Sequence, residues 1–116
     1  MRFDRRSASP GLLRGLGVVV MSASLVSAHA AGDPMRGKEK SEVCAACHGA
    51  DGNSPTPAFP RIGSQHTDYL LQALLDYKAG KRRNPIMAAQ VEALSKQDMA
   101  DLAAWYGAQK GLYVKR

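Results

Sequence analysis

The sequence predicts an all-α fold. Two stretches place apolar residues at helical spacing, residues 69–77 and residues 99–106. No alternating run of apolar and polar residues is long enough to form a sheet. The chain has 116 residues, which is room for one small domain.

The first 30 residues are typical of an export signal. An apolar run, residues 16–26, is followed by the small-residue sequence Ala28-His29-Ala30. The run is well short of the roughly 20 residues that a membrane-spanning helix needs, so an uncleaved anchor is the less favoured alternative. Basic residues precede it: Arg2, Arg5, Arg6 and Arg14. We therefore expect residues 1–30 to be a signal peptide, cleaved after Ala30, and residues 31–116 to form the mature domain.

The mature part carries a modest positive charge. Residues 31–116 contain 12 Lys and Arg against 9 Asp and Glu, a formal charge of +3, and the leader carries the rest of the chain's +6. No basic stretch is interleaved with aromatic residues, so we expect no nucleic-acid binding. Apolar burial alone gives marginal stability in a domain of this size, so we expect something else to help hold the fold.

The first predicted helix spans residues 35–46. Asp33 and Pro34 form an N-cap and first-turn signal, and Gly37 is the only helix breaker that follows. An irregular segment, residues 49–63, comes next. Its glycines and three prolines exclude a helix or a central strand: Pro55, Pro57 and Pro60.

Two further helices are predicted. The second spans about residues 66–79 and ends at Gly80, and residues 81–85 form a loop. The final helix is expected to begin at Ser95, with Asp98 completing a capping box. Its inner face carries four residues at helical spacing: Met99, Leu102, Ala103 and Tyr106.

The sequence Cys44-Ala45-Ala46-Cys47-His48 is the C-x-x-C-H signature of c-type haem attachment. Two sulfurs three positions apart on a helical turn face the same side, so each can add to one vinyl group of a haem. The histidine that follows then presents its imidazole to the iron. We therefore predict one haem c, covalently bound through Cys44 and Cys47, with His48 as an iron ligand. The buried macrocycle would also supply the core that a small chain lacks.

Three other uses of these residues are less favoured. A zinc site needs four ligands, whereas the chain has two cysteines and three histidines, of which His29 leaves with the leader. A thioredoxin-like redox pair requires a βαβ context, which the sequence lacks. A structural disulfide between positions three apart would cross-link very little of the chain.

Haem iron has a second axial position, and the methionines of the mature part are the main candidates. Met99 shares its spacing with core residues, and Met35 lies too near the first helix to reach the opposite face of a haem. Met87 follows an irregular segment and lies 39 residues beyond His48, which is enough chain to wrap around the macrocycle. We therefore predict Met87 as the sixth ligand. His66, at the start of a predicted helix, is a weaker candidate.

Taken together, these residues resemble class I c-type cytochromes of the monohaem bacterial type, over essentially all of residues 33–111. The chain is similar to one module of the dihaem cytochrome c subclass four. It has one C-x-x-C-H, so we expect no function that needs two coupled haems within one chain. The matching segments are Val43-Cys44-Ala45-Ala46-Cys47-His48-Gly49, Asp51-Gly52-Asn53-Ser54, Ala58-Phe59-Pro60-Arg61-Ile62, residues 65–70, Asn84-Pro85-Ile86-Met87 and Leu102-Ala103-Ala104-Trp105-Tyr106.

The resemblance implies a small cytochrome c fold of three to five helices wrapped around one covalently attached haem. It implies that the Pro60 carbonyl accepts a hydrogen bond from Nδ1 of His48, which fixes the ring, and that Ile62 packs on the haem. It also places Gly37 where the first helix crosses the last, so that Trp105 approaches closely. The expected cofactor-binding residues are Cys44, Cys47, His48, Pro60, Ile62 and Met87, with His48 and Met87 as the metal ligands.

With both axial positions filled, the iron has no open site for a substrate, which favours an electron carrier over an enzyme. We expect single electrons to pass between redox proteins, with a membrane-bound oxidase or reductase as one candidate partner and no small-molecule substrate. The alternatives are an electron-entry subunit of a larger oxidoreductase and a ligand-binding haem sensor. The leader and the place of haem attachment predict a periplasmic protein. Lys81-Arg82-Arg83 is either a docking patch for an acidic partner or a solvated loop.

Overall fold

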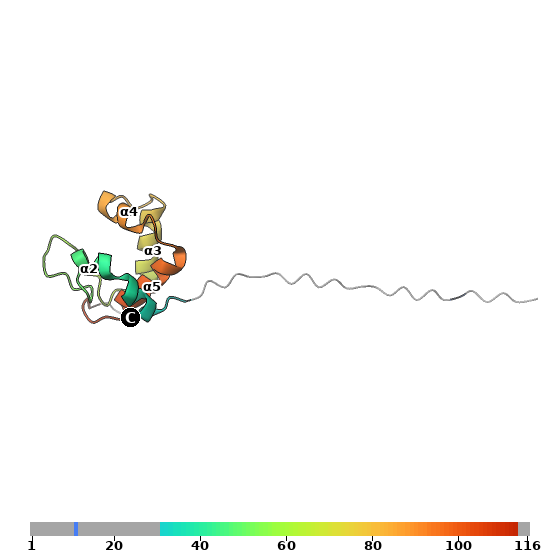
Figure 1. Ribbon diagram of the computed structural model, residues 1–116, viewed down its shortest axis with the longest axis horizontal. Coiled ribbons are helices and arrows are strands. Elements are labelled where there is room, and N and C mark those ends of the chain that lie inside the picture. Colours follow the sequence, from blue (N-terminus) through green and yellow to red (C-terminus); the bar gives the residue numbers. More distant parts are fainter. Residues whose placement is uncertain (1–10, 12–30, 114–116) are drawn as a thin grey trace, which may run out of the picture.

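The structure is a computed structural model that describes Gly11 and residues 31–113. The predicted signal peptide lies outside the described residues apart from Gly11, as do residues 114–116 of the predicted domain. Within residues 31–113 every regular element is a helix, which confirms the all-α prediction (Figure 1). The elements are α1 (Pro34–Lys40), α2 (Glu42–His48), α3 (Thr67–Lys78), α4 (Pro85–Val91) and α5 (Lys96–Gly107).

The prediction of one continuous first helix was wrong, because the chain forms α1 and α2 with a break at Ser41. The backbone N–H of Ser41 donates to the Lys38 carbonyl at 3.2 Å, and its hydroxyl donates to the same oxygen at 2.8 Å. A serine side chain that binds a nearby carbonyl competes in this way with the helical ladder. Since Ser41 is buried, the break is fixed by packing and turns α2 away from α1.

Helix α1 packs against α5, where Gly37 meets the last helix. A Cβ atom on Gly37 would lie 2.0 Å from the Asp101 carbonyl oxygen and 2.8 Å from Cβ of Trp105. The expected close approach of Trp105 is therefore confirmed, and the backbone at Asp101 is closer still. The predicted capping box of α5 is also present, because Ser95 and Asp98 each bind the other's backbone N–H. Two well-defined helices thus cross with no room for a side chain at residue 37.

A buried carboxylate, Asp101, lies at this crossing with its side chain 0% exposed. It accepts hydrogen bonds from the backbone N–H of Asp33 at 2.8 Å, from Lys40 Nζ at 2.8 Å and from Gln97 Nε2 at 2.9 Å. Arg36 Nε adds a fourth contact at 3.2 Å. Burial alone would raise the pKa of Asp101, but these donors outweigh it and hold the pKa below its usual range. The buried negative charge of Asp101 is therefore compensated by donors from α1, from the residue before it and from Gln97.

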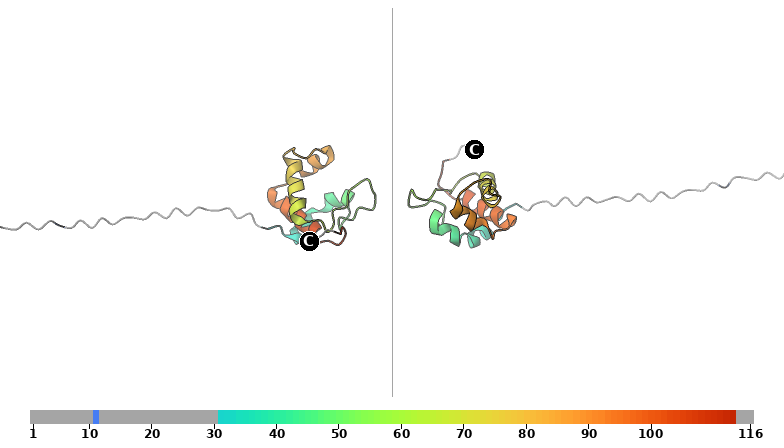
Figure 2. Two further views of the ribbon diagram at one scale, coloured as in Figure 1. Left: turned by 180° about the vertical axis from the view of Figure 1, so that it is seen from behind. Right: turned by 90° about the horizontal axis from the view of Figure 1, so that it is seen from above.

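Helix α3 also packs on α5, and α4 packs on the far end of α3 (Figure 2). The bounds of α3 confirm the predicted second helix. Helix α4 was not predicted, although its start carries a recognisable signal. The side chain of Asn84 accepts from the backbone N–H groups of Ile86 and Met87 at 3.0 and 3.1 Å, and Pro85 occupies the first helical position. This cap places Met87 in the first turn of a short helix.

The apolar core of the described residues is small. Its central cluster contains Leu70 of α3 and three residues of α5: Leu102, Ala103 and Tyr106. Further apolar side chains pack against the cluster while staying partly exposed, among them Ile62, Leu71, Leu74 and Leu94. The chain alone therefore leaves several apolar side chains around this cluster partly exposed.

Candidate functional site

The two cysteines and His48 lie along α2, at the edge of this core. Cys44 and Cys47 are unpaired and half-buried, and Cys44 packs against the central cluster. Burial raises the pKa of the Cys44 thiol, so this thiol is protonated at neutral pH. Residues three apart on a helix lie on one face. Both sulfurs are thus presented beside the apolar cluster.

His48, the last residue of α2, is buried and oriented by the loop that follows. Its Nδ1 lies 2.8 Å from the carbonyl oxygen of Pro60. A carbonyl can only accept, so Nδ1 carries the proton and Nε2 is the nitrogen with a free lone pair. The predicted contact between His48 and Pro60 is therefore present, and it prepares the imidazole for a metal bound at Nε2.

The loop between α2 and α3 is held in place by its own backbone. The carbonyl of Gly52 accepts from the N–H groups of Ile62 and Gly63, at 2.8 and 3.0 Å, which closes the loop behind Pro60. Gly52 has a φ of 76°, and a Cβ atom there would lie 2.6 Å from the Gly63 nitrogen. A side chain at residue 52 would meet both the left-handed conformation and this close contact. The carbonyl that orients His48 thus belongs to a segment held by backbone hydrogen bonds.

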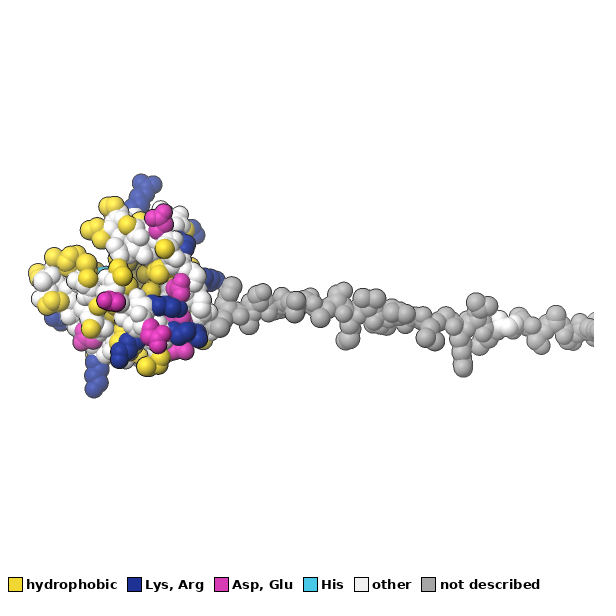
Figure 3. All heavy atoms as spheres, in the orientation of Figure 1, with side chains coloured by type: hydrophobic (Ala, Val, Ile, Leu, Met, Phe, Trp, Pro, Cys, Tyr) yellow, Lys and Arg dark blue, Asp and Glu magenta, His cyan; other side chains and the backbone are white. Residues whose placement is uncertain are grey.

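The surroundings of α2 fit a large apolar group. Ile62 and Cys44 both pack against the central cluster and remain partly exposed. A hollow with hydrophobic walls separates α2 and its loop from the α4 end of the molecule (Figure 3). Two thiols, one imidazole and an apolar wall are the set that a covalently attached haem requires. The residues present therefore fit haem c, while direct packing of Ile62 on the haem stays a prediction.

The methionines considered as sixth ligand occupy different environments. Met99 is 1% exposed within α5 and belongs to the core, and Met35 is 63% exposed on α1. Met87 is half-buried on α4, and Figure 1 shows α4 above α2. His66 is the N-cap residue of α3. Met87 is thus on an element separate from the one that carries His48, but its contact with iron stays a prediction.

Three further features of residues 31–113 concern metal clusters, disulfides and membrane-spanning helices. This part of the chain contains no group of three or more His, Cys, Asp or Glu side chains that could hold a metal ion. The two cysteines form no disulfide in the structure. Helices α1 to α5 are also all too short or too polar to cross a membrane.

One residue next to the site was assigned only to the core by sequence. Tyr106 is 3% exposed, and its hydroxyl has no hydrogen-bond partner among the described residues. Burial raises the pKa of Tyr106 to about 12, and the nearby thiol of Cys44 adds to the shift. Helical spacing predicted the burial of its ring, but spacing carries no information about the partner of a side-chain oxygen.

Comparisons with known proteins agree with this site. Cytochrome c4 of Pseudomonas aeruginosa is 52% identical over 83 residues, which are 72% of this chain and 41% of that protein. Cytochrome c-554(548) of Halomonas halodenitrificans is 36% identical over 83 residues, which are 69% of this chain and all of that protein. The crystal structure of reduced recombinant cytochrome c4 from Pseudomonas stutzeri superposes with a TM-score of 0.67 at 44% identity. The match covers 71% of this chain and 48% of that one.

The chain thus spans less than half the length of the cytochrome c4 proteins that it matches. Another relative is named as the cytochrome subunit of sulfide dehydrogenase of Chlorobaculum tepidum, 33% identical over 62% of this chain and 64% of that protein. Related cytochromes therefore include subunits of oxidoreductases. The sequence model of the family described as Cytochrome c matches residues 34–106. The chain belongs to the cytochrome c family, and haem c with its iron is its cofactor, covalently bound through Cys44 and Cys47.

Proposed function

We propose that this chain is a monohaem electron carrier that exchanges single electrons between redox proteins and has no catalytic residue. The observation that carries the proposal is the hydrogen bond of 2.8 Å between Nδ1 of His48 and the Pro60 carbonyl. This bond fixes the tautomer and orientation of the imidazole before any metal is bound. An imidazole held in this way keeps the same geometry in both oxidation states of a metal at Nε2.

In this proposal His48 and Met87 would hold the haem iron. Helix α4 carries Met87 in its capped first turn, from which the thioether would bind the iron. Haem iron supplies a one-electron centre when it is bound, and thioether ligation raises its potential relative to a second imidazole. With both positions held by the protein, a substrate or gas has no coordination site. This favours a carrier over an enzyme or a ligand-binding sensor.

The chain's own residues would do two things during electron exchange. Pro60 keeps the His48 ring from rotating, and the apolar side chains of Cys44 and Ile62 would exclude water from the cofactor. Both effects keep the site's geometry and solvation nearly constant as the charge changes by one, so little reorganisation accompanies the transfer. The donor loses one electron and the acceptor gains one, and no proton or bond is moved.

The same proposal places the mature protein in the periplasm of a Gram-negative bacterium. The leader predicted over residues 1–30 and covalent haem attachment, which takes place outside the cytoplasm, support this location. The partners would be other redox proteins, including a membrane-bound oxidase or reductase. A fixed electron-entry subunit of a larger oxidoreductase is the second candidate, which the similarity to a sulfide dehydrogenase subunit favours.

Visible spectra of the protein matured in a periplasm test the ligand set. In the oxidised wild type we expect the weak far-red absorption band that thioether ligation gives, and we expect Met87→Ala to abolish it. Met35→Ala is the matched control, because Met35 is 63% exposed on α1, and it should keep the band. An unchanged band in Met87→Ala would overturn the assignment of the sixth ligand. Rapid binding of carbon monoxide by the reduced wild type would instead favour the sensor, and stoichiometric co-purification with a dehydrogenase would favour the subunit.

A further inference from the structure

The loop between α3 and α4 carries three consecutive cations on a rigid backbone. Gly80, with a φ of 73°, ends α3. The N–H of Gly80 donates to the Tyr77 carbonyl at 3.2 Å, and the N–H of Lys81 donates to the Asp76 carbonyl at 2.9 Å. This pair of bonds is a Schellman motif, which fixes the chain just after a helix. Since the Asn84 cap begins α4 three residues after Lys81, a capped helix end precedes the cations and a capped helix start follows them.

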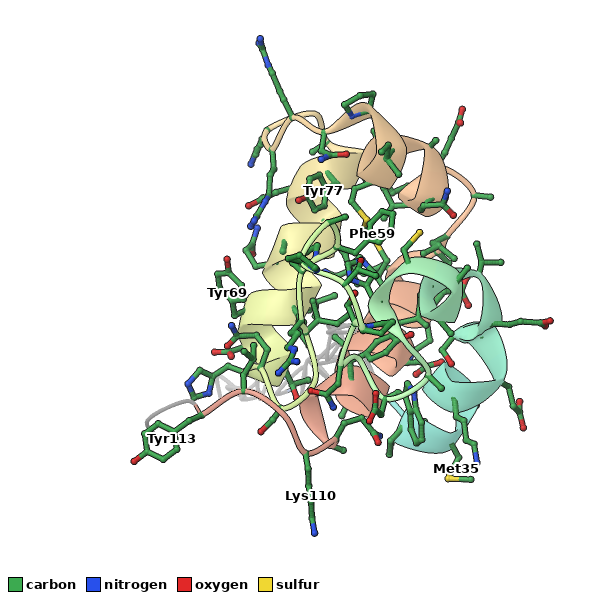
Figure 4. The ribbon with its side chains drawn as sticks, turned by 90° about the vertical axis from the view of Figure 1, so that its left-hand side faces the viewer. Met35, Phe59, Tyr69, Tyr77, Lys110 and Tyr113 are labelled. Carbon is green, nitrogen blue, oxygen red and sulfur yellow. The ribbon has the colours of Figure 1, made fainter. Side chains whose placement is uncertain are left out.

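The middle cation of this loop is also fixed in orientation. The guanidinium of Arg82 lies 5.1 Å from the centroid of the Tyr77 ring, and its Nη1 donates to the Tyr69 hydroxyl at 3.2 Å. Figure 4 shows both tyrosines along α3, below the loop. An arginine held by two aromatic side chains has already lost most of its rotational freedom, so a partner that binds it loses less entropy.

The charges of this loop are unpaired, unlike those at the α1–α5 crossing. All the ion pairs found among residues 31–113 involve Arg36 or Lys40 with an aspartate. Lys81, Arg82 and Arg83 are exposed and make no ion pair with a described residue. Arg36 and Lys40 are therefore paired with carboxylates within the fold, whereas the three cations of the α3–α4 loop are left for an external anion.

Exposed apolar surface adjoins these cations. Ile86, which is 58% exposed, follows the loop closely in sequence. Tyr69, which is 49% exposed, contacts the loop through its hydrogen bond with Arg82. Arginine and aromatic residues are enriched at protein interfaces, and charged residues at the rim steer the approach of a partner of opposite sign. We define the basic corner as Tyr69, Lys81, Arg82, Arg83 and Ile86. It combines unpaired cations with exposed apolar and aromatic surface.

We infer that the basic corner is the docking surface for the acidic face of a redox partner protein. The inference rests on the proposed function, because Met87 follows Ile86 directly and a partner seated here would cover the chain beside the sulfur ligand. An acidic face supplies the carboxylates that these unpaired cations lack. One electron then passes between the cofactor and the docked partner, and no atom is exchanged.

The first test compares two double variants of the holoprotein with equal loss of charge. Lys81→Glu/Arg83→Glu alters the basic corner, and Lys96→Glu/Lys110→Glu alters two exposed lysines elsewhere. Stopped-flow oxidation of each reduced protein by hexacyanoferrate(III), an anionic one-electron oxidant, is followed at low and high ionic strength. We expect the corner variant to react about fivefold or more slowly at low salt, the control to react less than twofold more slowly, and the difference to vanish near ~0.5 M salt.

A cationic oxidant and a mapping experiment complete the test. With tris(phenanthroline)cobalt(III) the corner variant should react faster than the wild type. Addition of poly-L-glutamate to the ¹⁵N-labelled reduced protein should shift the amide resonances of residues 69, 81–84 and 86 more than those of residues 96 and 110. Equal slowing of both double variants, or shifts centred on Lys96 and Lys110, would overturn the docking site. The far-red band reports separately on Met87, so loss of the docking effect with an intact band would leave the proposed function standing.

Discussion

The α1–α5 crossing and the half of the molecule that holds the cofactor are built in opposite ways. At the crossing, the backbone of α1 at Gly37 contacts the backbone of α5 at Asp101. The charge of the buried Asp101 side chain is compensated by its hydrogen-bond donors. On and after α2, Cys44 and Ile62 remain partly exposed, and Cys44 and Cys47 are left unpaired. The first region is complete within the polypeptide, whereas the second is completed by the haem. In a small chain, the polypeptide can therefore stabilise one helix pair while the cofactor stabilises the remaining part of the core.

Filling the space at residue 37 should have the largest effect. Gly37→Val would put a branched side chain where a single Cβ already lies 2.0 Å from the Asp101 carbonyl oxygen, which must separate α1 from α5. We expect the free energy of unfolding to fall by about 4 kcal/mol, or the holoprotein to fail to accumulate. Guanidinium unfolding of the holoprotein measures this. Gly80→Ala is the control, because nothing lies within 4 Å of a Cβ there and only about 1 kcal/mol of backbone strain is expected.

Removing the charge of Asp101 should cost slightly less. Asp101→Asn keeps the shape of the side chain but leaves Arg36 and Lys40 without their buried anion, so we expect a loss of about 3 kcal/mol. The exposed Glu92→Gln change provides a control of equal charge and should shift the unfolding midpoint very little. If both variants were equally stable, the crossing would not depend on its buried charge.

Acid should weaken the α1–α5 crossing. Hydrogen bonds from Lys40 and Ser95 lower the pKa of Asp98 to about 2, below its ordinary value near 3.9. A folded-state pKa that is depressed contributes stability above the unfolded value and loses it as the pH falls through the folded value. We therefore expect stability to decline between about pH 4 and pH 2. Urea unfolding midpoints of the wild type and Lys40→Met across this range should converge at the acidic end.

The sequence predicted the covalent attachment at Cys44 and Cys47 because the C-x-x-C-H motif fixes chemistry and spacing together, and the contact of His48 with Pro60 is also present. It predicted α3 and α5 because each has a clear apolar face and an end signal, Gly80 or Ser95. It missed the break at Ser41, since a serine hydroxyl that binds a carbonyl is a matter of local geometry rather than of periodicity. It also missed α4, whose seven residues are too few for a helical period to be recognised, although Asn84 and Pro85 form a start signal.

The next prediction compares one kind of helix cap in the two regions. Asn84→Ala and Ser95→Ala each remove a side chain that accepts from the backbone at the start of a helix, and each should cost about 1 kcal/mol. Only Asn84 positions the turn that carries Met87. We expect Asn84→Ala to weaken the far-red band of the oxidised protein, and Ser95→Ala to leave the band unchanged. The same response in both variants would mean that the Asn84 cap has no influence on the ligand.

The smallest effect is expected at Tyr106, which joins the two regions. Its ring belongs to the core cluster, but its hydroxyl has no partner among the described residues, so Tyr106→Phe removes no hydrogen bond within them. Replacing a buried hydroxyl that lacks a partner should change the unfolding free energy of the holoprotein by less than about 1 kcal/mol, in either direction. Chemical denaturation with haem absorbance as the probe measures the change. A loss well above that figure would show that the hydroxyl is bonded in the mature protein, and the haem side of the core would then be as fully paired as the α1–α5 crossing.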